Sequence, residues 1–243
     1  MPISDNFVVR KDIPSQQLTK IYEIDNTTYK VYGNNQGIVL QESSTNKNEN
    51  FNINLIKENK EYNNFTPMTL SKTGEDIIIL VHYYHPIEDG GMASGLYMVE
   101  VGESVKIDKI DLKGQCCINY EIEPVIIDDN IYVNTYGNIG SISISKKSFN
   151  TVPYFDTLKN EAQSNPNLAQ GVPDSFKYQP VIGKLGNILL LSYGGESTNY
   201  IWGIHADKVI FKIITSNSDI FDDTESKIGS TNRGIEKVLL PNW

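Results

Sequence analysis

The stretch IEPVIIDDNIYVNTYG, residues 122–137, decides the fold because it reads as two short strands around a tight turn. An apolar run follows the proline, Asp-Asp-Asn forms the turn signal, and a second run is β-branched and aromatic. The same order recurs in DNTTYKVYG (25–33), GEDIIILVHYY (74–84) and LGNILLLSYGG (185–195). Aligned on Asn26, Asp76, Asn130 and Asn187, the four stretches predict four equivalent hairpins.

Each hairpin is followed by two further alternating runs, so that four strands recur with a period of roughly fifty residues. This pattern is typical of a β-propeller blade, a four-stranded sheet that packs on its neighbours around an axis. We expect an all-β chain that forms one propeller domain over residues 1–243. The four predicted blades lie near residues 17–57, 64–112, 117–156 and 176–214.

The ends of the chain bear on how the ring would close. Strands are expected at residues 6–10 and 234–241, and they either pair into a partial fifth blade or extend existing blades. We favour five blades, with a β-sandwich as the alternative fold. One helix is expected at residues 156–168, ended by Pro166.

Composition excludes some partners. The net charge is -9, and Arg10 and Arg233 are the only arginines, which argues against nucleic acid and favours a basic protein partner. The longest aliphatic run, residues 77–81, is too short to span a bilayer, and the first residues lack a secretory apolar core. The adjacent Cys116 and Cys117 are expected as thiols, and we predict a cytoplasmic protein.

Propeller geometry predicts where a binding site lies. The loop entering the first strand of a blade shares a face with the loop between its second and third strands. Near the axis this face carries the residues that precede three prolines: Thr66, Glu123 and Gln179. Around the rim it carries His85, Glu88 and Asp89 from one loop, and Glu196 and Asn199 from another. The turn at Asp128 and Asp129 belongs to the opposite face.

The order of acidic residue, proline, apolar run, Asp-rich turn and Tyr-Gly resembles the blades of five-bladed furanosidase-type propeller glycosidases, such as arabinanases and levansucrases. That resemblance implies three carboxylates at the inner-strand entries, and it places Glu123 at one of them. The matching positions in the neighbouring blades are Thr66 and Gln179. Glycoside hydrolysis normally uses two opposed carboxylates, so the resemblance covers the blade pattern and no catalytic set.

Other constellations are weaker. His82, His85, Glu88 and Asp89 lie close in sequence, but strand alternation places the two histidines on opposite faces, so we expect no metal site and no cofactor. We therefore predict a non-catalytic protein that binds another macromolecule, such as an inhibitor or immunity protein that blocks a basic toxin or enzyme. The alternative is a carbohydrate-binding lectin or a glycoside hydrolase centred on Glu123.

Overall fold

The computed structural model describes residues 19–45, 47–55, 65–86, 92–115, 117–120, 122–135, 138–152, 181–194, 198–205, 208–216 and 235–239. These residues form strands and turns and no helix, which confirms the all-β prediction. The chain divides into two compact units, Met1–Tyr120 and Glu121–Trp243, and each is described by itself. The predicted helix at 156–168, the predicted strand at 6–10 and Cys116 lie outside the described residues.

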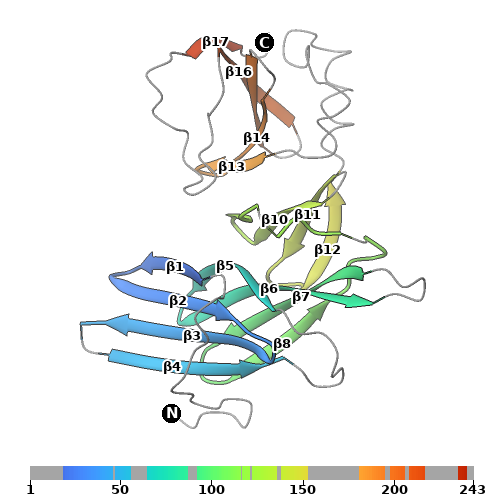
Figure 1. The fold of residues 1–243 in the computed structure, drawn as a ribbon. Helices are drawn as coiled ribbons and strands as arrows, with labels where there is room; N and C mark the ends of the chain where they lie inside the picture. Colours follow the sequence, from blue (N-terminus) through green and yellow to red (C-terminus); the bar gives the residue numbers. More distant parts are fainter. Residues whose placement is uncertain are drawn as a thin grey trace. The chain divides into compact units, whose positions relative to one another are not determined.

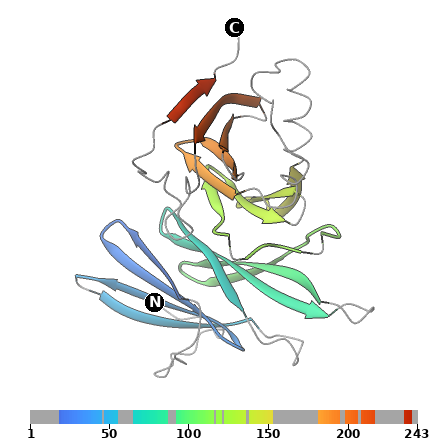
Figure 2. The ribbon, with the colours of Figure 1, turned by 45° about the horizontal axis from the view of Figure 1, so that its top comes forward.

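The first unit contains two four-stranded antiparallel sheets, each with its strands in sequential order (Figures 1 and 2). The first sheet comprises β1 (Thr19–Ile24), β2 (Thr27–Gly33), β3 (Gly37–Ser44) and β4 (Lys47–Asn54). The second comprises β5 (Thr66–Thr73), β6 (Asp76–Pro86), β7 (Met92–Val101) and β8 (Val105–Ile110).

The second unit contains one four-stranded and one five-stranded antiparallel sheet. The third sheet of the chain comprises β9 (Val125–Ile127), β10 (Asn130–Thr135), β11 (Asn138–Ser143) and β12 (Ser148–Val152). The fourth comprises β13 (Val181–Leu185), β14 (Ile188–Gly194), β15 (Thr198–His205), β16 (Lys208–Ser216) and β17 (Ile235–Leu239). Because β17 pairs with β16, the predicted strand at 234–241 extends an existing sheet.

The first hairpin of every sheet has a two-residue turn. Its first residue is left-handed in all four sheets: the φ angles are 51° at Asp25, 62° at Gly74, 51° at Asp128 and 59° at Gly186. Left-handed backbone favours Gly, Asn and Asp, which explains why these residues recur at the turns in the sequence. The prediction of four repeated hairpins is confirmed at this level.

The sequence alignment of the hairpins is wrong by one residue in two sheets. Asn26 and Asn187 are second turn residues, whereas Asp76 and Asn130 are the first residues of the strands that follow. The alignment matched Asp and Asn residues. The position of the turn is set by the residue with left-handed backbone, which in the second sheet is Gly74. The sequence alignment put His82 at the strand position of Tyr32 and Tyr193. Side chains alternate along a strand, so the one-residue error means that His82 points to the opposite face of its sheet from the one that this alignment predicted.

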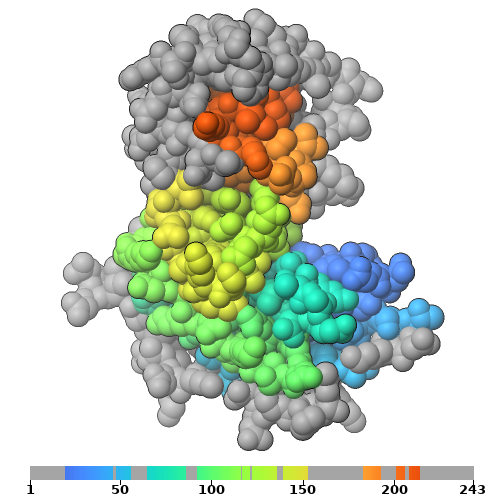
Figure 3. Space-filling model, turned by 180° about the vertical axis from the view of Figure 1, so that it is seen from behind, coloured from blue at the N-terminus to red at the C-terminus, as the bar shows by residue number. Residues whose placement is uncertain are grey.

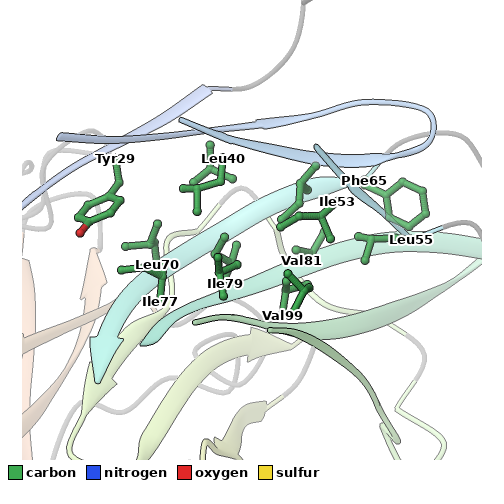
Figure 4. Close-up of a cluster of buried hydrophobic side chains, with 14 of the residues drawn as sticks. Tyr29, Leu40, Ile53, Leu55, Phe65, Leu70, Ile77, Ile79, Val81 and Val99 are labelled. Atoms are coloured by element: carbon green, nitrogen blue, oxygen red, sulfur yellow. The ribbon is translucent and has the colours of Figure 1, made fainter. Parts of the chain in front are cut away.

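The two sheets of the first unit pack face to face around one apolar core. Tyr29, Leu40 and Ile53 of the first sheet lie against side chains of β5, β6 and β7 (Figure 4). From the second sheet the core receives Leu70, Ile77, Ile79, Val81 and Val99, among others. In the space-filling view the first sheet (blue) and the β5–β6 part of the second (teal) adjoin without a gap (Figure 3). Such packing is common to neighbouring propeller blades and to a β-sandwich, and no sheet among the described strands closes on itself.

The second unit has an equivalent core between its two sheets. Val125, Ile127 and Ile139 of the third sheet pack with buried residues of the fourth, including Leu191 and Trp202. In both units the first strand of the second sheet also reaches the first strand of the sheet before it. β1 contacts β5 and β9 contacts β13. The Lys72 ammonium of β5 lies 2.9 Å from the carboxylate of Asp25, the turn residue after β1, and the Lys184 ammonium of β13 donates to the Ile126 carbonyl of β9 at 3.0 Å.

We predict that Gly95→Ala destabilises the protein by about 2 kcal/mol, because Gly95 is directly opposite Tyr83 and a Cβ there would collide with the Tyr83 ring. The free energy of unfolding, measured with urea, checks this. Gly74→Asn is the matched control, since Gly74 has open space around it and Asn tolerates its φ of 62°. Equal losses in the two variants would contradict the packing that we describe.

Candidate functional site

Two predicted site residues of the first unit lie at the same end of the second sheet. Thr66 is the first residue of β5 and pairs with His82, near the end of β6. His85 pairs with Ala93, close to the start of β7. The prediction placed both residues on one face of a propeller, and that face stays a prediction.

A cluster of five residues lies on one face of this sheet end and is called the His82 cluster: His82, Tyr84, Ser94, Ile118 and Tyr120. The His82 Nε2 atom lies 3.0 Å from the Ser94 hydroxyl, and that hydroxyl accepts the Ile118 backbone N–H at 2.8 Å. The Tyr120 ring stacks on His82 with centroids 5.0 Å apart, and the Tyr84 ring meets His82 edge-on at 4.6 Å. The cluster therefore ties β6 and β7 to the segment 117–120.

The His82–Ser94 pair is not arranged for nucleophilic catalysis. Both side chains are buried, with 1% of His82 and 3% of Ser94 exposed. Burial lowers the pKa of His82 to about 4, so the imidazole is neutral at pH 7 and a weak base. The Ser94 oxygen is also occupied by the Ile118 N–H. These contacts are typical of buried polar side chains whose hydrogen bonds stabilise the fold.

The opposite face of the same sheet end carries a second aromatic group. Tyr83 stacks on Tyr97 with centroids 4.8 Å apart, and the ring of Phe65 lies 5.9 Å from that of Tyr83. Burial raises the pKa of Tyr83, although its hydrogen bond with Tyr97 acts in the other direction. His85 lies beside Tyr83, with ring centroids 6.0 Å apart.

The two neighbouring histidines thus face opposite sides of the sheet, as strand alternation predicts. His82 contacts Tyr84, whereas His85 contacts Tyr83. Within the described ranges, no three His, Cys, Asp or Glu residues are placed to hold a metal ion. Glu88 and Asp89 lie outside those ranges.

An exposed surface adjoins the His82 cluster and is called the rim surface: Tyr84, Met92 and Tyr120. Tyr84 is 36% exposed and Met92 is 50% exposed, while Tyr120 is half-buried. Because Met92 pairs with Pro86 and Tyr84 with Ser94, Tyr84 and Met92 lie on one face of the hairpin. The rings of Tyr84 and Tyr120 meet edge-on, 5.9 Å apart. The sequence did not predict these three residues as a site. They come together through the contact of Tyr120 with β6, and a contact between separate segments produces no repeating pattern in the sequence.

Two predicted site residues of the second unit, Glu123 and Asn199, lie at the corresponding ends of their sheets. Glu123 is half-buried and precedes the buried Pro124 and β9. Asn199 pairs with Gly194 at the end of β14. Gln179 and Glu196 lie outside the described residues. Thr66 and Glu123 belong to different units, so their arrangement around one axis stays a prediction.

Asp128 and Asp129 form a structural turn at the other end of β9 from Glu123, as expected. The Asp129 carboxylate accepts hydrogen bonds from the Ser143 hydroxyl at 2.7 Å, and from the Ser145 hydroxyl at 2.7 Å and backbone at 2.9 Å. These bonds lower the pKa of Asp129, the Ser143 bond most. The carboxylate thereby fastens the first hairpin of this sheet to the turn between β11 and β12.

A buried lysine in the second unit was missed by sequence analysis. Lys212 is 2% exposed and pairs across β15–β16 with Trp202, which is fully buried. Its ammonium lies 5.8 Å from the Trp202 ring centroid, within cation–π range. The run VIFKII contains this single lysine, but strand alternation alone would place it opposite Ile201; the register shift between Gly203 and Ile204 brings it opposite Trp202, and that shift leaves no signal in the sequence.

Comparisons with known proteins add no assignment. No protein-family model matches the chain, and no curated protein matches its sequence. Among the described residues, no helix is long and apolar enough to cross a membrane.

The buried His82 predicts a pH-dependent stability. Its pKa is about 4 in the fold against 6.5 ordinarily, so the unfolded chain binds the proton more tightly and stability falls as the pH drops. We expect a loss of roughly 3 kcal/mol from His82 as the pH falls from 6.5 through 4, and the loss should level off below pH 4. Urea unfolding at several pH values measures it.

The control for this experiment is an exposed histidine. His82→Phe should flatten the pH dependence over this range, whereas His205→Gln should leave it, because His205 is exposed. If the two variants and the wild-type protein show the same pH dependence, His82 does not cause it.

Proposed function

We propose that the protein is a non-catalytic β-propeller that binds another protein through the rim surface. The observation that carries the proposal is the rim surface itself, in which exposed Tyr84 and Met92 are presented by a hairpin that the His82 cluster holds in place. Tyrosine and methionine are enriched at protein interfaces, and tyrosine is frequent among the residues that dominate binding energy. Anchored side chains also lose less conformational entropy on binding.

The propeller part of the proposal is supported by the repeated sheets. Four sheets share sequential strand order, as blades do, and a two-residue first turn whose first residue is left-handed. In a propeller the first strands of neighbouring blades lie closest to the axis and therefore approach each other. β1 contacts β5 and β9 contacts β13 in this way within each unit, and the Lys184–Ile126 hydrogen bond joins the latter pair.

Charge points to a basic partner. The chain has a net charge of -9, and complementary charge across an interface speeds association and selects partners. An inhibitor or immunity protein that blocks a basic toxin or enzyme fits this balance. The Ser94 and His82 side chains, which are both buried and engaged with each other, favour binding over catalysis.

Affinity capture tests the proposal when it is combined with rim variants. Purified wild-type protein should retain a basic protein in stoichiometric amount from an extract of the cells that make it, and the double variant Tyr84→Ala/Met92→Ala should weaken that binding at least about tenfold. Leu185→Ala is the matched control, because Leu185 is also an exposed apolar residue, 54% exposed, but belongs to the second unit. The affinity is then measured by calorimetry with the purified partner.

The outcomes separate the interpretations. Loss of binding in the rim variant alone supports the proposal. Equal binding by all three proteins, or no basic protein retained, contradicts it.

Carbohydrate binding is a second candidate, favoured by the exposed tyrosine ring of Tyr84 and the half-buried Glu123 at a strand entry. A panel of furanosides and glycans tests it. Binding that is lost in Tyr84→Ala would favour a lectin, and hydrolysis that is lost in Glu123→Gln would favour a glycosidase. Neither result is expected if the partner is a protein.

A single closed propeller also predicts the size of the molecule in solution. A compact chain of 243 residues should have a radius of gyration of about 18 Å. Small-angle X-ray scattering on the full chain measures this radius. A clearly larger value, with two separated maxima in the distance distribution, would indicate two units joined by a linker.

A further inference from the structure

We propose that His82 and Ser94 form a pH-sensitive clamp that holds the segment 117–120, and with it Tyr120 of the rim surface. The segment follows β8 and lies at the end of the first unit. Three side chains of the second sheet contact it: the Ile118 N–H donates to Ser94, and the Tyr120 ring stacks on His82 and meets Tyr84 edge-on. The clamp is independent of what the rim surface binds.

The neutral imidazole allows every bond of the clamp to be satisfied. A serine hydroxyl has one proton to donate and two lone pairs. Ser94 accepts the Ile118 N–H at 2.8 Å, and it can give its own proton to an unprotonated Nε2 of His82 at 3.0 Å. The three groups then form a chain in which each bond polarises the next.

Protonation from solvent breaks this arrangement. A protonated Nε2 is a donor, so the Ser94 hydroxyl can no longer donate to it and its proton is left without that acceptor inside a buried site. The imidazolium also carries a charge into a position where the His82 side chain is 1% exposed. Opening of the segment returns His82 to water and relieves both costs.

No charged group among the described residues facing His82 compensates the added proton. β5 contributes Thr66 and β7 contributes Ser94 and Leu96, while β6 contributes Tyr84. The segment contributes Ile118 and Tyr120. The only titratable groups in this set are the two phenols, and burial alone accounts for the lowered pKa of His82.

The clamp has a consequence for the rim surface. Tyr120 meets Tyr84 edge-on and stacks on His82, so release of the segment removes one of the three rim residues from its place. On the proposed function, acidification therefore weakens partner binding. The clamp can be tested without any partner, so its failure is distinguishable from failure of the binding proposal.

Amide hydrogen exchange on the full chain, followed by mass spectrometry at pH 6.5, 5.5 and 4.5, tests the clamp. After correction for intrinsic exchange rates, protection of a peptide containing Ile118 should fall by on the order of tenfold or more between pH 6.5 and 4.5. Peptides from β2 and β3 should keep their protection. Loss of protection in those strands to the same extent would mean general unfolding and would overturn the clamp.

Three variants assign the effect. His82→Phe keeps a ring against Tyr120 but cannot titrate, so protection of the segment should become independent of pH. His205→Gln should behave as the wild-type protein. Ser94→Ala removes only a hydroxyl and replaces the His82 variant in the test if that variant fails to fold. In Ser94→Ala, protection of the Ile118 amide should already be low at pH 6.5. Unchanged protection in Ser94→Ala, or wild-type pH dependence in His82→Phe, would overturn the proposal.

Discussion

The first unit depends on the burial of the central part of β6. Every side chain from Ile77 to Tyr83 is buried, whichever face of the sheet it points to. Ile77, Ile79 and Val81 face the core shared with the first sheet, and the alternate residues face away from it. A strand buried in this way can carry a polar side chain only where that side chain finds hydrogen-bond partners.

His82 meets that condition through Ser94, and the consequences reach the surface. Because the histidine is buried, its neutral form is favoured; because it is neutral, Ser94 can bond to it and to Ile118 together. The same ring supports Tyr84 and Tyr120. A constraint that begins with core packing thus positions the residues that we propose bind a partner.

The strands and first hairpins could be predicted from the sequence because they depend on local signals, namely alternation and left-handed turn residues. The register at Asp76 could not be predicted from the sequence. Gly74 and Asp76 are both residue types common in turns, and only the backbone shows that Gly74 is the left-handed one. That Thr66 and His85 lie at the same end of their sheet follows from the sequential antiparallel order of its strands. The link between His82 and Tyr120 joins residues that are far apart in sequence, and its only trace was a polar residue in each of the runs IIILVHYY and MASGLYM.

The central claim is that His82 is neutral and bonded to Ser94 near neutral pH. Nitrogen-15 NMR of the His82 ring, assigned with the His82→Phe variant, measures its protonation directly between pH 7.5 and 3.5. The account predicts ring shifts that stay constant down to about pH 5, with Nε2 unprotonated, and that then change around pH 4. Ring shifts that change around pH 6.5, as for a solvated imidazole, would contradict it.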